Sequence, residues 1–144
     1  MTYMEFKEKW QKEVNELPMY FAFSDKQFNE LMIKLGYDDE NVFLKDIMSV
    51  GGGSIILKKD KELIMNTFDR IDKELTENFK NDEFLESAFE YELGNHEYCI
   101  TYDISETLDA LDISYDEYQN NERIQKIAKK AIKKYMDKMK KIGW

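Results

Sequence analysis

The sequence is poor in the residue types that build covalent or metal-stabilised folds, with one cysteine, one histidine and one proline among 144 residues. The single cysteine, Cys99, cannot form a disulfide within the chain, which is typical of a reducing cytosol. A structural zinc site needs four nitrogen or sulfur ligands, so Cys99 and the single histidine, His96, cannot complete one within a monomer. We therefore expect neither a metal nor a cofactor.

Long apolar runs are missing as well. No stretch approaches the roughly 20 apolar residues that cross a bilayer. Residues 1–7 lack the basic start and the apolar stretch of a signal peptide. The sequence therefore predicts a soluble, cytoplasmic protein with no membrane partner.

Positive charge is absent from a long part of the chain. Residues 81–122 contain thirteen acidic side chains and no Lys or Arg, whereas residues 123–144 contain nine basic side chains and one acid. The net charge of −9 argues against direct nucleic-acid binding, which depends on Lys and Arg neutralising phosphates. The acidic stretch favours a partner with a basic surface, unless the basic C-terminal stretch neutralises it within the molecule. The sequence leaves both possibilities open.

Composition and length place limits on the fold. Apolar residues make up 42% of the chain and aromatic residues 14%, which is enough for a packed core despite the high charge. A chain of this length suits one domain, 1–144, better than two. The patterns predict an α+β fold, in which a small antiparallel sheet of short strands packs with about five to six helices, including a long C-terminal helix.

Local signals predict where the elements begin and end. Capping-box spacing at Thr2, Ser24 and Ser114 marks three helix starts. The expected helices cover residues 2–17, 24–35, 61–79, 84–94, 105–111 and 114–143, and the expected strands cover 19–23, 97–102 and both arms of a hairpin over 43–57. Gly51–Gly53 lies in that hairpin and lacks the order of a phosphate loop, so it predicts a turn, although its three glycines could let a partner approach the backbone.

The second half of the acidic stretch is the best candidate site. It combines carboxylates with aromatic side chains that could anchor a partner: Tyr102, Asp103, Glu106, Asp109, Asp112, Tyr115, Asp116 and Glu117. Such carboxylates could occupy the lysines and arginines that otherwise hold phosphates, as in a nucleic-acid mimic. The alternative is a solvated surface with acids at helix N-termini, where the helix dipole favours them.

Two other functions remain open. An enzyme or small-molecule site could use His96 and Cys99 with Glu92 and Asp103, beside the glycine turn. On one strand, however, the odd separation of His96 and Cys99 would point them to opposite faces, so we expect no catalysis. A regulatory module could instead dimerise through the apolar stripe of the C-terminal helix. The oligomeric state is not determined by the sequence.

Several segments resemble a known family. They are residues 20–24, 49–53, 82–85 and 91–103, of which the run from Asn95 to Asp103 is the most specific. They resemble a family of small uncharacterised proteins of bacteriophages and prophages. The resemblance implies an anti-defence context, such as anti-CRISPR inhibition. We therefore predict a phage-encoded acidic binding protein that blocks a basic groove on a host defence or nucleic-acid-handling enzyme in the host cytoplasm.

Overall fold

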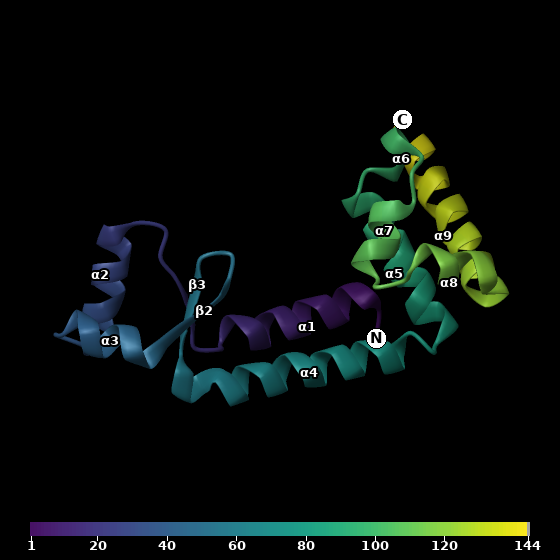
Figure 1. Ribbon diagram of the computed structural model, residues 1–144. Coiled ribbons are helices and arrows are strands. Elements are labelled where there is room, and N and C mark those ends of the chain that lie inside the picture. The colour runs from purple at the N-terminus through teal and green to yellow at the C-terminus, as the bar shows by residue number, and fades with distance from the viewer. Residues whose placement is uncertain (144) are drawn as a thin grey trace. The chain divides into compact units, whose positions relative to one another are not determined.

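A computed structural model describes residues 1–143 (Figure 1). It confirms an α+β fold in which helices predominate and a small sheet has three antiparallel strands. The chain groups into two compact units. We call residues 1–9 with those from 74 onward unit 1, and residues 10–73 unit 2. Helices α1 (Tyr3–Asn15) and α4 (Lys61–Asn78) each contribute residues to both units.

Unit 2 contains the sheet. Its other elements are β1 (Met19–Phe21), α2 (Asp25–Lys34), α3 (Glu40–Asp46), β2 (Ile47–Gly51), β3 (Ser54–Leu57) and the 3-10 turn Lys58–Asp60. The strand order is β1-β3-β2, with Met19 opposite Ile56 and Ile47 opposite Leu57. The predicted hairpin therefore forms, and β1 adds to its second arm.

The hairpin is shorter than predicted because helix α3 takes up the beginning of the segment predicted as its first arm. Phe43 is fully buried, with its ring centroid 5.2 Å from that of Phe28 and 5.0 Å from that of Tyr37. It lies on α3 and not on a strand, because the side chain of Asp39 accepts a hydrogen bond from the amide of Asn41 and starts a helix there. The first arm of the hairpin begins only after this helix ends.

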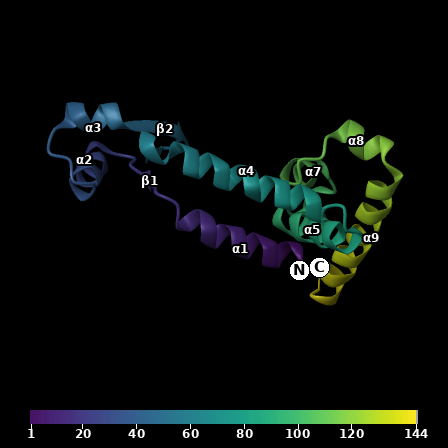
Figure 2. The same cartoon turned by 90° about the horizontal axis from the view of Figure 1, so that it is seen from below.

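Unit 1 is helical. Besides the parts of α1 and α4, it contains α5 (Asp82–Asn95), α6 (Tyr98–Thr101), α7 (Ser105–Ala110), α8 (Tyr115–Asn120) and α9 (Glu122–Lys141). Helix α9 lies along α5 (Figures 1 and 2). Both helices bury an apolar stripe, which on α9 consists of Ile124, Ile127, Ala128, Ala131 and Tyr135. The stripe that could have served a dimer is thus packed within unit 1.

The three predicted capping residues each begin a helix. The Thr2 hydroxyl accepts from the Glu5 amide, and Ser24 and Ser114 cap α2 and α8 in the same way. The long helix predicted from Ser114 is nevertheless broken. Asn121 has an extended backbone, and its side chain accepts a hydrogen bond from the amide of Ile124, which starts α9 as a separate helix. An internal cap therefore divides the predicted element in two.

The predicted strand over residues 97–102 is wrong. The segment forms the short helix α6, and both flanking residues, Glu97 (φ 54°) and Tyr102 (φ 52°), have left-handed backbone conformations that end a strand. Helix α5 also runs past Gly94, whose missing side chain faces the ring of Tyr135, 3.7 Å from the position a Cβ would take. Packing against α9 thus overrides the local preferences at both places.

Other local predictions also need correction. Strand β1 ends at Phe21, two residues before the predicted end, and the side chains of Phe21 and Phe23 are exposed. Helix α7 begins without a side-chain cap from Ser105, whose amide instead donates to the Asp103 carboxylate. Within residues 1–143, no helix combines the length and apolar character needed to cross a membrane.

Replacing Asn121 by alanine should lower the free energy of unfolding by about 1 kcal/mol, because α9 loses the acceptor for its first turn. Denaturant unfolding followed by circular dichroism measures this change. The control is Gln119→Ala on the exposed side of α8, expected to change stability by less than about 0.5 kcal/mol. Equal effects of the two substitutions would contradict the internal cap.

Candidate functional site

The thirteen acids of residues 81–122 fall into two groups with different surroundings. The first group lies mainly on α5 and faces the basic side of α9. Four ion pairs join the two helices, namely Arg123–Asp82, Lys130–Glu86, Lys134–Glu86 and Lys138–Glu90. The Lys134 ammonium lies 2.6 Å from Glu86. Burial raises the pKa of Glu86, but Lys134 and Lys130 outweigh it and hold this pKa below its usual range. Three of the thirteen acids are therefore paired with basic residues of α9.

The second group lies in residues 102–117, which we call the acidic segment. It runs from the end of α6 through α7 to the first turn of α8. All eight residues predicted as a binding site are exposed: Tyr102, Asp103, Glu106, Asp109, Asp112, Tyr115, Asp116 and Glu117. In the part of the chain that the structure describes, none of the six carboxylates pairs with a lysine or arginine. Of the basic residues of α9 that follow in sequence, Arg123, Lys130, Lys134 and Lys138 pair with acids of α5 instead.

Two carboxylates of the acidic segment have other roles. Asp103 accepts a hydrogen bond from the Ser105 amide at 2.9 Å, and its bonds to Ser105 lower the pKa of Asp103. A Glu106 oxygen lies 3.2 Å from Nδ1 of His96. These contacts stabilise the local conformation of the segment and do not remove its negative charge.

Tyrosine rings adjoin these carboxylates. The ring of Tyr98 lies 6.0 Å from that of Tyr102, and the ring of Tyr115 lies 6.3 Å from that of Tyr118. Burial raises the pKa of Tyr118, and the proximity of Tyr98 and Tyr115 raises it further. Tyr102 and Tyr115 are 66% and 58% exposed, while Tyr98 and Tyr118 are half-buried. Two exposed aromatic side chains therefore rest on partly buried tyrosines.

A buried carboxylate, that of Glu92, lies next to His96, which also contacts Glu106 of the acidic segment. Glu92 on α5 is 1% exposed and accepts hydrogen bonds from the Tyr3 hydroxyl at 2.8 Å, from Lys7 at 3.0 Å and from Asn95 at 3.2 Å. Burial raises the pKa of Glu92, but these three donors outweigh it and lower the pKa overall. Burial and the bond to Glu92 raise the pKa of Tyr3. Glu92 is therefore ionised at neutral pH and ties the start of α1 to α5.

His96 connects this carboxylate to the acidic segment. Its Nε2 lies 3.3 Å from Glu92 and its Nδ1 lies 3.2 Å from Glu106. Each ring nitrogen thus faces a carboxylate, so a substrate would have to displace one of them before His96 could act as a base. The backbone amide of Cys99 donates to the Tyr135 hydroxyl, and its thiol is buried. Of the four residues proposed for an enzyme, the structure brings Glu92 and His96 together, and the glycine turn belongs to unit 2.

Among residues 1–143, no three His, Cys, Asp or Glu side chains are grouped so that they could hold a metal ion.

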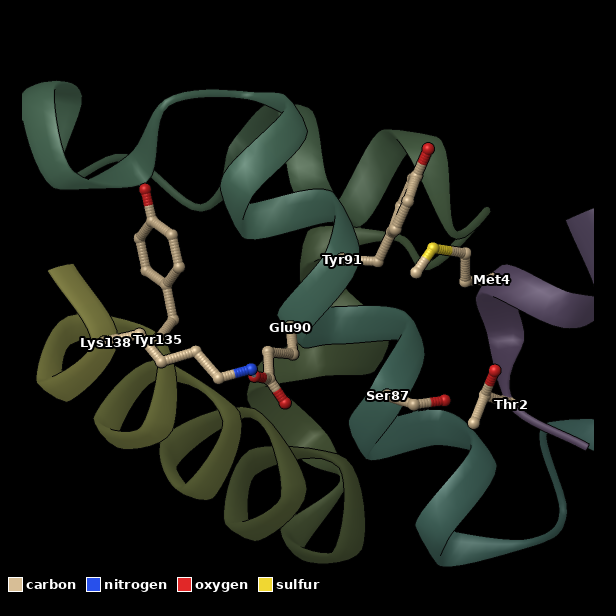
Figure 3. A pocket seen from close by; sticks show the side chains of 7 residues that line it. All are labelled: Thr2, Met4, Ser87, Glu90, Tyr91, Tyr135 and Lys138. Atoms are coloured by element: carbon tan, nitrogen blue, oxygen red, sulfur yellow. The ribbon is translucent and has the colours of Figure 1, made fainter. Parts of the chain in front are cut away.

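A pocket that the sequence analysis missed lies elsewhere on unit 1. It has a volume of about 380 Å³ and is lined by side chains of α5, α9 and the start of α1 (Figure 3). These residues are Thr2, Met4, Ser87, Glu90, Tyr91, Tyr135 and Lys138. Lys138 and Glu90 form an ion pair on one side. The spacing of Ser87 and Glu90 predicts that they share one face of a helix. No pattern in the sequence predicts that Thr2 lies beside them.

Comparison with known proteins identifies a family but assigns no function to its residues. The model of a family of unknown function (DUF7659) matches residues 2–134. No curated protein and no solved structure matches the chain. The residue roles therefore have to be derived from the contacts and charges of this chain itself.

Tyr3→Phe should cost about 1.5–3 kcal/mol of stability at pH 7, because a buried charge loses a hydrogen-bond donor. The folded-state pKa of Glu92 lies below its unfolded value, so the stabilisation is complete above the unfolded pKa and is lost as the pH falls through the folded pKa. The cost of Tyr3→Phe should accordingly shrink under acid conditions. Urea unfolding at pH 7 and at an acidic pH measures the cost of the substitution under each condition.

Tyr115→Phe provides the matched control, because it removes the same hydroxyl from an exposed ring. We expect it to change stability by less than about 0.5 kcal/mol at either pH. A Tyr3→Phe cost that did not depend on pH would contradict the role assigned to Glu92.

Proposed function

The chain belongs to a family of unknown function (DUF7659), and we propose that it is a binding protein whose acidic segment docks into a basic groove on a partner protein. One observation carries the proposal. Asp82, Glu86 and Glu90 of α5 are paired with lysines and Arg123 of α9, whereas the six carboxylates of residues 102–117 have no such pairing within the described chain. Six carboxylates without a lysine or arginine partner thus lie within one short segment.

This charge would act mainly on recognition and encounter. A surface of one sign attracts a partner of the opposite sign over distances comparable with the Debye length, about 8 Å at physiological ionic strength. Such attraction accelerates association and disfavours acidic partners. Binding should therefore weaken as salt is added.

Affinity needs contacts that exclude water in addition to charge. Tyr102 and Tyr115 are exposed aromatic side chains, a type enriched at the centres of protein interfaces, and the carboxylates around them would form the polar rim. Each ring rests against another tyrosine, so it loses little conformational freedom when a partner covers it. We assign these two side chains the role of anchors.

The kind of partner follows from the same chemistry. Grooves rich in lysine and arginine are typical of proteins that hold nucleic acids. A carboxylate segment that occupies such a groove would exclude the phosphate backbone, and the partner would be inhibited without any chemical step. The resemblance of Asn95–Asp103 to small phage proteins supports a host defence or nucleic-acid-handling enzyme as the target, as for an anti-CRISPR protein. This target class is part of the proposal.

The test uses charge reversal with a matched control. The variant carries Asp109→Lys, Asp112→Asn and Asp116→Lys, with Asn at position 112 because that residue has a left-handed backbone. The control carries Glu30→Lys, Asp38→Asn and Asp69→Lys, which are exposed acids of unit 2 and give the same change in net charge. Tagged proteins capture partners from a bacterial host lysate, and the captured protein is then purified and titrated calorimetrically.

The variant should bind at least tenfold more weakly, a loss of about 1.4 kcal/mol, while the control should bind like the unmodified chain. Nucleic acid should compete with the unmodified chain for the captured protein. Equal binding by variant and control would remove the acidic segment as the contact surface.

The pocket favours a second candidate function. Its volume of about 380 Å³ lies within the range of small-molecule sites, and it combines apolar side chains with an ion pair.

Two tryptophan variants test ligand binding by the pocket. Met4→Trp should fill the pocket, whereas Met65→Trp places the same ring at an exposed site on α4. Small aromatic amines and carboxylates whose NMR signals respond to the unmodified chain and to Met65→Trp, but not to Met4→Trp, would support ligand binding. No response by the unmodified chain would remove this candidate.

A further inference from the structure

His96 occupies the junction between the buried part of unit 1 and the acidic segment. It follows α5 as its C-cap residue, and its ring lies between Glu92 of α5 and Glu106 in the first turn of α7. It is the only histidine in the chain. The ring therefore links a buried carboxylate to an exposed one.

The protonation state of the ring decides how many of these contacts are hydrogen bonds. A neutral imidazole has one N–H and an imidazolium has two. A neutral ring can donate to Glu92 or to Glu106 but leaves the other carboxylate facing a lone pair. Nε2 is buried and makes no hydrogen bond within the described chain, although Glu92 lies 3.3 Å away. Protonation would therefore satisfy both sides of the ring at once.

Charged groups lie on both sides of the ring. The charged groups in ion-pair reach of His96 are Glu92 from α5 and Glu106 from α7. From α1, Lys7 pairs with the other oxygen of Glu92, which also accepts from the Tyr3 hydroxyl. With an imidazolium, two cations face two carboxylates. With a neutral imidazole, one negative charge is left over, and it belongs to the exposed Glu106.

The chain between the two contacts depends on external support. Residues 97–105 contain two non-glycine residues in left-handed conformations, Glu97 and Tyr102, which are unfavourable for side chains with a Cβ. Helix α6 between them has only four residues and gains little from its own hydrogen bonds. The buried Thr107 and Leu108 anchor α7, and the contact between His96 and Glu106 fixes its exposed first turn relative to α5.

We propose that His96 is a proton-operated clamp that regulates the acidic segment. The protonated ring holds α7 to α5 and compensates the charge of Glu106. The neutral ring releases Glu106 and adds one uncompensated carboxylate to the binding surface. Affinity for a basic partner therefore rises as the pH increases through the titration of His96. This regulation rests on the proposed function, whereas the clamp itself can be observed in the isolated protein.

The first experiment needs no partner. Histidine ordinarily changes charge between pH 5 and 8, where Asp and Glu ordinarily do not. In an NMR titration over this range, the His96 ring and the backbone amides of residues 104–108 should shift with one common midpoint. In His96→Gln, the amide shifts of residues 104–108 should disappear. In Glu106→Gln, the amide shifts of residues 104–108 should become smaller, because Nδ1 then faces an uncharged amide.

Two results would overturn the clamp. One is a His96 titration that residues 104–108 do not follow. The other is a titration of these amides that persists in His96→Gln, because the chain then has no imidazole. A purely structural role of His96 would change stability but would not give a shared midpoint.

The second experiment separates the clamp from the proposed function. A peptide of ten arginines serves as the basic probe, titrated into the protein at pH 5.5 and pH 8. We expect several-fold tighter binding at pH 8, and no difference between the two pH values for His96→Gln. Peptide binding without pH dependence would overturn the regulation and leave the proposed function standing. Absence of binding at both pH values, with the NMR coupling present, would overturn the proposed function and leave the clamp standing.

Discussion

The pairing of α5 with α9 is the interaction on which the organisation of unit 1 depends. Each helix buries an apolar stripe, and the acids of α5 meet the basic residues of α9 along the edges of that contact. The lysine ends of these ion pairs are exposed, so each pair contributes little stability. Their larger consequence is that Arg123, Lys130, Lys134 and Lys138 pair with α5 and not with the acidic segment. Residues 102–117 are therefore left without a lysine or arginine partner in the part of the chain that the structure describes.

A second constraint acts at the other end of α5. Glu92 is a buried charge, and leaving such a charge without partners is costly, so Tyr3, Lys7 and Asn95 are needed around it. His96 extends this arrangement toward the surface, where it meets Glu106. The negative charge that drives the proposed binding is thus connected, through one titratable ring, to the interior of the unit. Protonation of His96 would therefore act on the buried and the exposed carboxylate at the same time.

Periodicity and caps predicted the long elements well because these signals are local. The stripe of α9 and the caps at Thr2, Ser24 and Ser114 depend on residues three or four apart. The failures lie where tertiary contacts or an internal cap prevail, as at residues 97–102 and at Asn121. The exposure of the acidic segment was also predictable, because six carboxylates in fifteen residues can hardly be buried. The link between Tyr3 and Glu92 and the pocket were not, since both join residues more than eighty positions apart.

The central claim is that the acids of α5 are occupied within the molecule while those of residues 102–117 are free to meet a partner. Zero-length carbodiimide cross-linking of the captured complex, read by mass spectrometry, tests it directly. The account predicts that carboxylates of residues 103–117 link to lysines of the partner, and that Glu86 and Glu90 link to lysines of α9 in the same chain. Partner cross-links confined to α9 or to unit 2, with none from residues 103–117, would contradict it.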